Sequence, residues 1–410
     1  MKLGYLYSRY PVLSQTFCDM EMLELERRGH EVVLGSMYPP KTELRHEYLK
    51  QLRAPVHYAP SKEQLESLMR KAKRSGRWPA GLVAEHERKY GPDYKAALRA
   101  RNALFFVELF EREGLRFFHV HFANRAAHTA IFVKAISGIP FGVTAHGQDF
   151  MTDLGSQELL CDICANAEFV AAETDYSRDL LAQCCPDLGQ KFLRVYNGID
   201  IRRFSSSDPQ GSTRDRVRIL SVARLVPFKG FDVLIDACAE LRSRGVRFSC
   251  EIIGEGPLRD ELHARAARHN FHGDELRFAG EQSQAAVLKA MRECDIFVLA
   301  SMHDDRGASD VFPTVIGEAM ASGKPVVSTT VAGIPELVAN GEIGFLVPPQ
   351  DSAALASAIE KLARDTDLRL QFGRQARARI EREFTIEKTI EPLLNAFRGA
   401  MHSPVATGVQ

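Results

Sequence analysis

Short runs of apolar residues alternate with longer segments of helical pattern along most of this chain. In the first half, the apolar runs predict strands at residues 2–7, 30–36, 118–122, 139–144, 168–174 and 191–196. In the second half, they predict strands at residues 217–222, 248–253, 276–278, 296–300, 325–329 and, after a turn, within 341–348. Strands that alternate with helices are typical of an α/β protein with doubly wound parallel sheets.

The length and a polar interruption indicate two domains. The chain has 410 residues, more than a single hydrophobic core usually serves. Residues 205–213 read Ser-Ser-Ser-Asp-Pro-Gln-Gly-Ser-Thr, a polar segment rich in residues that break helices and strands. We therefore predict domains at residues 1–204 and 215–385, joined by a linker at 205–214. Residues 403–410 are small and polar without periodicity, as in a disordered tail.

The composition argues against two classes of function. Lys and Arg together number 53, as do Asp and Glu, so the net charge gives no reason to expect a nucleic acid partner. No apolar run is long enough to span a bilayer, and residues 2–7 fit a first strand better than a signal peptide. We therefore expect a cytoplasmic protein.

The eight cysteines lie mostly in apolar patterns, which suits a reducing compartment. Cys161 and Cys164, followed by the adjacent Cys184 and Cys185, could imitate a zinc site. However, the first pair lies on the apolar face of its helix, and adjacent cysteines suit a tetrahedral metal poorly. No metal site is predicted at these residues.

Residues 41–116 form a basic region, with 17 Lys or Arg against 10 Asp or Glu. Its densest part is Arg70-Lys-Ala-Lys-Arg-Ser-Gly-Arg-Trp78. A run of this kind is usually the solvated face of a helix, and we favour that interpretation. The functional alternative is a surface for an anionic membrane or a lipid phosphate, with Trp78 at the interface.

A loop, a helix and a strand follow one another in residues 310–329, around two carboxylates. Asp310 precedes a Pro-Thr helix start, and Glu318 lies one turn into the helix. The backbone N–H groups from Thr314 to Gly317 would lie at the positive end of the helix, where a phosphate is well placed. The carboxylates would then accept hydrogen bonds from ligand hydroxyls. The alternative is an ordinary buried helix with an incidental acid at each end.

Two other loops of the second half carry candidate binding residues. Arg224 and Lys229 follow the strand at 217–222, and such charges can stabilise negative charge that develops on a leaving group. Two basic residues in a loop are unremarkable alone. Gly254-Glu255-Gly256-Pro257 follows the strand at 248–253, and its glycines would let the backbone approach a nucleotide.

In the first half, the loop at residues 8–17 occupies the first turn from strand to helix, where α/β sheets bind ligands. It contains the candidate Ser14. The alternative is a simple connection in which the hydroxyl of Ser14 or Thr16 caps the next helix.

Three histidines lie in or just after predicted strands. His119 and His121 fall on one face of the strand at 118–122, and we favour packed core histidines there. His146 lies just beyond the strand at 139–144, beside Gly147, and we favour a role in the site.

Together these motifs resemble the retaining, nucleotide-sugar-dependent glycosyltransferases of the GT-B fold. The largest such family, glycosyltransferase family four or glycosyl transferases group 1, carries Glu, seven residues, then Glu-Ala-Met-Ala-x-Gly-x-Pro-Val-Val. Residues 310–327 match this motif, with Asp310 in place of the first Glu. Arg-Leu-x-x-x-Lys-Gly at 224–230 and Thr-Ala-His-Gly-x-Asp at 144–149 are also similar to the family. The loop at 11–17 resembles the Pro-x-x-Ser-Glu-Thr-Phe variant of enzymes that build exopolysaccharides and surface glycans, with Gln15 in place of Glu.

The resemblance implies two Rossmann-like domains facing a cleft, with a C-terminal helix at 386–402 that packs back on the first domain. It implies transfer of a sugar, with retention, from a nucleoside-diphosphate donor to a glycan or lipid-linked acceptor. The departing diphosphate can then act as the base, so no metal or other cofactor is expected. His303, Asp304 and Asp305 of the loop before Asp310 are accordingly not predicted to bind a metal.

The same resemblance assigns roles to single residues. It implies that Glu318 binds the ribose hydroxyls and that Arg224 and Lys229 bind the diphosphate. It implies that Asp310 and His146 contact the transferred sugar. Gly256 would lie near the nucleotide. The other donor-binding candidates are Glu255, Thr314, Val315 and Ser14. The alternatives are a noncatalytic nucleotide-binding member of a glycan-assembly complex, for which Asp310 is the best argument, and a GT-B epimerase or hydrolase.

Overall fold

The computed structural model describes residues 1–41, 46–204 and 215–402, which form two compact units. The first unit contains Met1–Tyr196 and the residues from Ile390 onward, and the second contains Asn197–Thr389. The predicted linker at 205–214 and the predicted tail at 403–410 lie outside the described residues. The second unit begins before residue 205 because Ile199 hydrogen-bonds within it: its N–H donates to Phe384 O (2.8 Å), and its carbonyl accepts from Ile386 N–H (3.0 Å).

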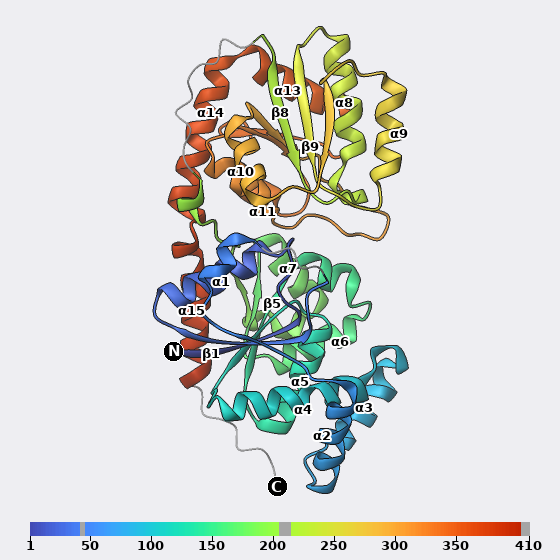
Figure 1. Cartoon of the computed structure of the whole chain (residues 1–410), viewed down its shortest axis with the longest axis vertical. Coiled ribbons are helices and arrows are strands. Elements are labelled where there is room, and N and C mark those ends of the chain that lie inside the picture. Colours follow the sequence, from blue (N-terminus) through green and yellow to red (C-terminus); the bar gives the residue numbers. More distant parts are fainter. Residues whose placement is uncertain (42–45, 205–214, 403–410) are drawn as a thin grey trace. The chain divides into compact units, whose positions relative to one another are not determined.

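The first unit is built on a sheet of seven parallel strands in the order β3-β2-β1-β4-β5-β6-β7 (Figure 1). The strands are β1 (Lys2–Arg9), β2 (Glu31–Tyr38), β3 (Val56–Tyr58), β4 (Phe118–His121), β5 (Phe141–Ala145), β6 (Val170–Ala172) and β7 (Phe192–Arg194). The order reverses direction between β1 and β4. Ligands bind at the carboxyl ends of the strands at such a point, where the loop after β1 and the end of β4 lie.

Helices connect these strands, namely α1 (Thr16–Arg27), α2 (Lys62–Arg74), α3 (Ala80–Tyr90), α4 (Ala96–Arg112), α5 (Arg125–Ser137), α6 (Gln157–Asn166) and α7 (Asp175–Cys184). Helix α5 has common signals at both ends: the Asn124 side chain accepts from Ala126 N–H, and Gly138 adopts a left-handed φ of 75°. The helix α1 is present, but the hydroxyl cap considered for it is not found, because its N-cap is Gln15 and neither Ser14 nor Thr16 caps it.

The last helix, α15 (Ile386–His402), contributes to the core of the first unit. Leu393, Leu394 and Phe397 are fully buried in a hydrophobic cluster with residues of β1 and α1. The Phe397 ring lies 5.5 Å from that of Phe117, centroid to centroid. The residues from Ile390 therefore belong to the interior of the first unit.

Cys161 in α6 and Cys185, just after α7, form a disulfide with their Cα atoms 5.5 Å apart. This pairing corrects the expectation that the cysteine pattern is that of reduced thiols. The sequence did not indicate it because Cys161 lies on an apolar helix face and the two cysteines are 24 residues apart. The other six cysteines are free thiols.

The second unit contains a sheet of six parallel strands in the order β10-β9-β8-β11-β12-β13. They are β8 (Val217–Val222), β9 (Phe248–Ile253), β10 (Leu276–Gly280), β11 (Ile296–Val298), β12 (Val326–Thr329) and β13 (Gly344–Val347). The helices are α8 (Phe231–Ser243), α9 (Arg259–His269), α10 (Gln284–Glu293), α11 (Thr314–Ala321), α12 (Ile334–Leu337), α13 (Ser352–Arg364) and α14 (Thr366–Arg379). Both sheets thus confirm the predicted doubly wound α/β class.

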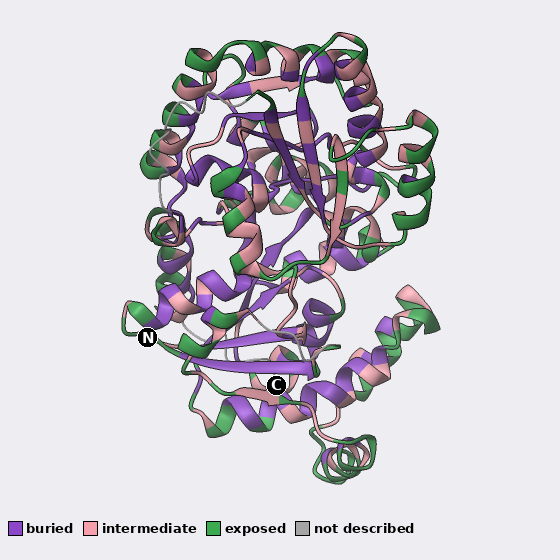
Figure 2. Ribbon diagram, turned by 45° about the horizontal axis from the view of Figure 1, so that its top comes forward, coloured by how far each residue is buried: buried purple, intermediate pink, exposed green. Residues whose placement is uncertain are grey.

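Burial explains why apolar runs mark the strands. Strands of both sheets are buried along much of their length, whereas the outer faces of the helices are exposed (Figure 2). Within the described residues, no helix is long and apolar enough to cross a membrane.

Candidate active site

In the second unit, the predicted site residues Lys229 and Asp310 are in direct contact. Lys229 lies in a short 3-10 turn before α8, and its ammonium pairs with Asp310 Oδ1. The other carboxylate oxygen of Asp310 accepts from the Ser301 hydroxyl at 2.5 Å. The pair is largely shielded from water, since 13% of the Lys229 side chain and 9% of the Asp310 side chain are exposed. The structure therefore brings together two residues that are 81 positions apart in sequence.

Close packing of backbones holds the loops after β8, β9 and β11 together. A Cβ atom on Gly230 would lie 1.9 Å from the carbonyl oxygen of Ala300, and one on Gly256 would lie 2.4 Å from that of Leu225. A methyl group fits at neither place. The contact with the loop that carries Arg224 and Lys229 is thus enough to require glycine at position 256. From the sequence, this glycine was expected to let the backbone approach a nucleotide.

Helix α11 begins at Thr314 beside this loop cluster. Its N-cap is Pro313, and no side chain among the described residues caps it. The N–H groups of its first turn are therefore suited to an anionic ligand, as the sequence predicted. Thr314 and Val315 at this end are half-buried.

Glu318 lies one turn into α11 and is half-buried. Burial raises the pKa of its carboxyl from 4.5 to about 7, and the positive charge of Arg203 opposes that rise only in part. Glu318 can therefore change charge near neutral pH.

Two other candidates of the second unit lie nearer the surface. Arg224 is exposed in the loop after β8. Glu255 is half-buried and forms an ion pair of 3.5 Å with Arg259 of α9, while its backbone carbonyl accepts from Leu225 N–H at 2.9 Å. The loop after β9 is thus bonded to the loop after β8.

In the first unit, His146 follows β5 and is buried, with both ring nitrogens engaged. Its Nδ1 lies 2.7 Å from Glu173 Oε1, and its Nε2 lies 3.0 Å from His121 Nδ1. The rings of Phe17 and Phe122 flank it, with centroids at 4.6 and 4.5 Å. The sequence pointed to His146 but gave no indication of its partner Glu173, because one acid at a strand end has no distinguishing pattern.

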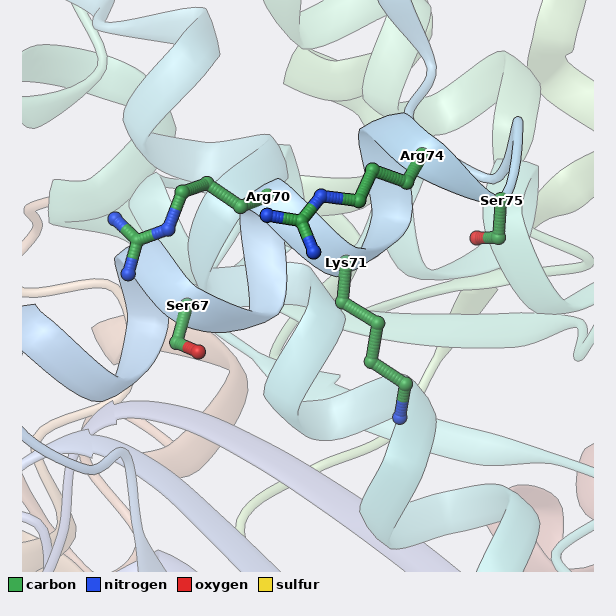
Figure 3. Close-up of a pocket in the computed structure, with 5 residues that line it drawn as sticks. All are labelled: Ser67, Arg70, Lys71, Arg74 and Ser75. Carbon is green, nitrogen blue, oxygen red and sulfur yellow. The ribbon is translucent and has the colours of Figure 1, made fainter.

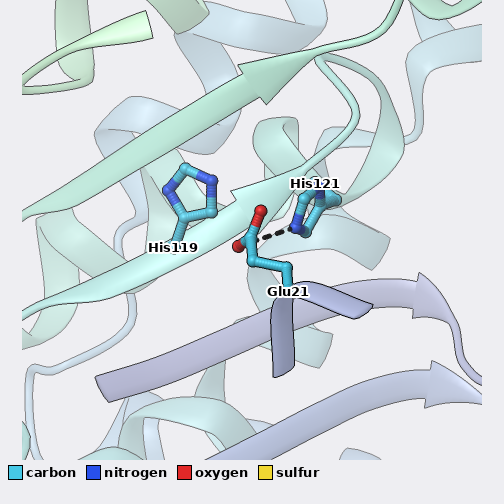
Figure 4. A group of neighbouring side chains, drawn as sticks. All are labelled: Glu21, His119 and His121. Atoms are coloured by element: carbon cyan, nitrogen blue, oxygen red, sulfur yellow. Dashed lines mark hydrogen bonds and ion pairs between the residues drawn. The ribbon is translucent and has the colours of Figure 1, made fainter. Parts of the chain in front are cut away.

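His119 and His121 are both buried, as favoured from the sequence. His119 Nε2 lies 2.8 Å from the Thr144 hydroxyl, and burial together with the neighbouring histidines lowers its pKa to about 3. His121 also contacts Glu21 of α1, with 3.2 Å between Nε2 and Oε1 (Figure 4). Glu21, like Glu173, was missed, because the helical pattern placed it among other acids of α1.

Ser14 is exposed in the loop after β1, and the structure gives it no distinct geometry.

The ligand atoms of Glu21, His119 and His121 lie within 4.8 Å of one another, a spacing that could hold a metal ion. Here the nitrogen atoms facing Glu21 and Thr144 make hydrogen bonds instead.

In the loop before Asp310, Asp304 accepts from the N–H groups of Arg306 and Ala308, each at 2.9 Å. Asp304 thus serves to shape that loop.

The basic region contains a surface pocket of about 350 Å³ on α2, lined by Ser67, Arg70, Lys71, Arg74 and Ser75 (Figure 3). The two arginines are exposed, whereas the Lys71 ammonium lies 3.3 Å from Glu108 of α4. Trp78 is half-buried against the hydrophobic core, and the Lys73 ammonium lies 5.4 Å from its ring centroid. Part of the Trp78 ring is thus used for packing, and its place at a membrane interface stays a prediction.

Comparison with known proteins finds a family match in the second half of the chain and relatives that are glycosyltransferases by name. Residues 203–379 match the model of the glycosyl transferases group 1. The amylovoran biosynthesis glycosyltransferase AmsK of Erwinia amylovora is 28% identical over 405 residues, covering 94% of this chain and 96% of that protein. The putative colanic acid biosynthesis glycosyltransferase WcaL of Escherichia coli K12 is 35% identical over 203 residues, which cover 48% of this chain and 50% of that protein.

Solved structures support the same assignment at the level of fold. HepE of Anabaena in complex with UDP-glucose superposes with a TM-score of 0.74 at 20% identity, covering 97% of this chain and 100% of that one. Sucrose-phosphate synthase of Thermosynechococcus elongatus gives a TM-score of 0.73 at 17% identity, with coverage of 98% and 100%. With the two doubly wound units, these findings show that the chain has the GT-B fold and that residues 203–379 match the glycosyl transferases group 1.

Proposed function

We propose that this enzyme moves a sugar from a nucleoside-diphosphate donor to a glycan or lipid-linked acceptor, with retention of configuration, during the synthesis of a surface polysaccharide. The observation that carries the proposal is the contact between Lys229 and Asp310, beside a helix N-terminus that no described side chain caps. The names of the relatives AmsK and WcaL, which refer to amylovoran and colanic acid biosynthesis, support the polysaccharide role. The UDP-glucose in the HepE structure supports a nucleotide-sugar donor.

In the proposed mechanism, positive charge stabilises the departing diphosphate. The bond between the anomeric carbon and the diphosphate oxygen breaks as the acceptor oxygen bonds to the same face of that carbon. The proton of the acceptor hydroxyl passes to the diphosphate. Arg224, Lys229 and the N–H groups of α11 supply the stabilising charge, so the proposal needs no metal.

Asp310 and Lys229 exchange partners in this scheme. In the structure, the Lys229 ammonium is paired with the Asp310 carboxylate. When a diphosphate binds, the ammonium turns to the phosphate oxygens and frees Asp310 Oδ1 to accept from a sugar hydroxyl. The Ser301 hydroxyl donates to the second carboxylate oxygen at 2.5 Å and so fixes the orientation of the Asp310 carboxylate.

The remaining donor contacts are assigned by resemblance. Glu318 accepts from the ribose hydroxyls, Gly256 and Glu255 lie along the nucleotide, and Thr314 and Val315 offer backbone N–H groups to phosphate. In the first unit, Ser14 and His146 are the candidates for sugar or acceptor contacts.

The exposed basic face of α2 suits an anionic partner. Arg70 and Arg74 point away from the hydrophobic core, and they lie with Lys71 around one pocket (Figure 3). We include in the proposal a peripheral contact of this face with an anionic membrane or with the phosphate of a lipid-linked acceptor, at the cytoplasmic side.

The test is release of nucleoside diphosphate from a panel of nucleotide sugars, with and without EDTA. A transferase releases diphosphate only with a matching donor and an acceptor, EDTA has no effect, and the anomeric proton of the product shows the configuration of the donor. Replacing Lys229 by Ala should lower the rate about 100-fold or more. Replacing Lys289, an exposed lysine of α10, is the matched control. A protein that is stabilised by nucleotide but never releases diphosphate would instead be a noncatalytic binding module.

A further inference from the structure

Four side chains of the first unit form one continuous hydrogen-bonded chain. Glu21 meets His121 at 3.2 Å, His121 meets His146 at 3.0 Å, and His146 meets Glu173 at 2.7 Å. They come from α1, the end of β4, the loop after β5 and the residue after β6, so the chain runs along the carboxyl ends of neighbouring strands. Figure 4 shows its first contact, between Glu21 and His121.

The number of protons in this chain follows from its geometry. Each of the three contacts needs one proton between its two heavy atoms. Two neutral imidazoles bring two protons, and two carboxylates bring none. One further proton must therefore be bound, which makes one histidine an imidazolium or one glutamate a neutral acid.

The distances place this extra proton at His146. The contact with Glu173 has the length of a charge-assisted N⁺–H···O⁻ bond, which is about 2.7–2.9 Å. The contact of His121 with Glu21 is longer, at 3.2 Å, as expected for a neutral imidazole N–H. His121 then accepts the Nε2 proton of His146 at its own Nδ1.

The groups around the chain leave the two glutamates as the counter-charges of His146. On β1, burial raises the pKa of Tyr5 and Tyr7, and on α1 it raises that of Cys18, so all three are uncharged. Burial also raises the pKa of Asp149, which accepts from the N–H of His146 at 3.1 Å. On β4, His119 is neutral at ordinary pH.

Glu21 itself is an anion. Burial raises the pKa of its carboxyl, but the hydrogen bonds of His121 and Tyr5 contribute to a net lowering of that pKa to about 2. The Tyr5 hydroxyl also donates to it at 2.6 Å.

We propose that Glu173 and His121 are positioning residues that hold His146 as a cation at the ligand-binding edge of the first sheet. Glu173 stabilises the imidazolium from one side, and His121 accepts its second proton on the other. The rings of Phe17 and Phe122 keep water away from this charge, which is therefore weakly screened. The role of the cation in transfer rests on the proposed function, whereas its existence does not.

The experiment is nitrogen NMR of the full-length protein with ¹⁵N-labelled histidine, recorded from pH 6 to 9. His146→Gln identifies the signals of that ring. We expect His146 to show two protonated nitrogens at pH 8 in the wild type. In Glu173→Gln, which keeps the size of the side chain and a hydrogen-bonding group, the doubly protonated share of His146 at pH 8 should fall several-fold. Glu168→Gln, which changes a half-buried carboxylate paired with Lys134, should leave it unchanged.

A neutral His146 in the wild type at pH 8, or an unchanged titration in Glu173→Gln, would overturn the proposal. The same variants, assayed for diphosphate release against pH, report on the catalytic role separately. Glu173→Gln should lose activity in the pH range where its His146 has become neutral and retain more of it at lower pH. If no variant or wild-type sample releases diphosphate, the proposed function fails while the spectra still decide the charge of His146.

Discussion

Asp310→Asn tests the proposal that Lys229 exchanges Asp310 for the diphosphate when the donor binds. The variant keeps a group that can bond to Ser301 but removes the counter-charge of a lysine whose side chain is 13% exposed. Removing one partner of a buried ion pair costs about 3–5 kcal/mol. The partial exposure of Lys229 favours the lower end, about 3 kcal/mol. For a unit of this size, that loss lowers the melting temperature by roughly 6–12 °C.

The affinity for nucleoside diphosphate should change in the opposite sense. In the variant, the unpaired ammonium of Lys229 gains a partner when diphosphate binds. If half of the lost 3 kcal/mol returns on binding, the affinity rises about tenfold. Turnover with the full donor should nevertheless fall about 100-fold, because the sugar loses its charged acceptor.

Calorimetry with the nucleoside diphosphate alone, beside turnover with the full donor, separates these effects. Asp305→Asn, an exposed position in the same loop, is the matched control and should change neither quantity. A marked loss of diphosphate affinity in Asp310→Asn, or normal turnover, would refute the reasoning that the pair exchanges partners.

Three other predictions concern titration, charge and surface. In the proposed function, Glu318 accepts hydrogen bonds from the ribose hydroxyls, and an ionised carboxylate accepts them best. The affinity for nucleoside diphosphate should therefore rise between pH 6 and 8 as Glu318 loses its proton near pH 7. Calorimetry of Glu318→Gln should show an affinity that does not change over this pH range. Because the pKa of Glu318 is raised in the folded state, its favourable contribution to the free energy of unfolding is fully present below about pH 4.5 and is lost as the pH rises through 7. Denaturant unfolding of Glu318→Gln should therefore lack this part of the pH dependence. Neutralising Arg70, Lys71 and Arg74 together should weaken salt-sensitive binding to anionic vesicles without changing the melting temperature by more than a few degrees. If the variant binds vesicles as well as the wild type does, the basic face of α2 is only a solvated surface.

The fold was readable from the sequence because its determinants are local. Buried parallel strands need near-continuous apolar runs, and each such run is short and bounded by helix caps or glycines. The end of α5 at Gly138 is of this kind. The start of α1 is the exception, since backbone bonds such as Gln15 N–H to Val12 O, at 2.9 Å, hold the loop in place of a hydroxyl cap.

Only those parts of the candidate site that carry a recognisable sequence motif could be predicted. Lys229 and Asp310 each belong to a recognisable loop, but that they form an ion pair depends on how those loops pack. Glu21 and Glu173 carry no local pattern, and their importance comes from contact with histidines up to 100 residues away. The disulfide of Cys161 likewise depends on the packing of α6 against the chain after α7.

The helix α15 has a consequence for the order in which the protein is made. The core around Tyr5 and Phe117 is completed by Leu393, Leu394 and Phe397, which are synthesised only after the whole of the second unit. Burial of three such side chains contributes about 5–9 kcal/mol, comparable to the whole stability of a typical domain. The first unit therefore cannot reach its final stability when its own strands have been made, and this apolar surface stays open until the second unit has also been synthesised.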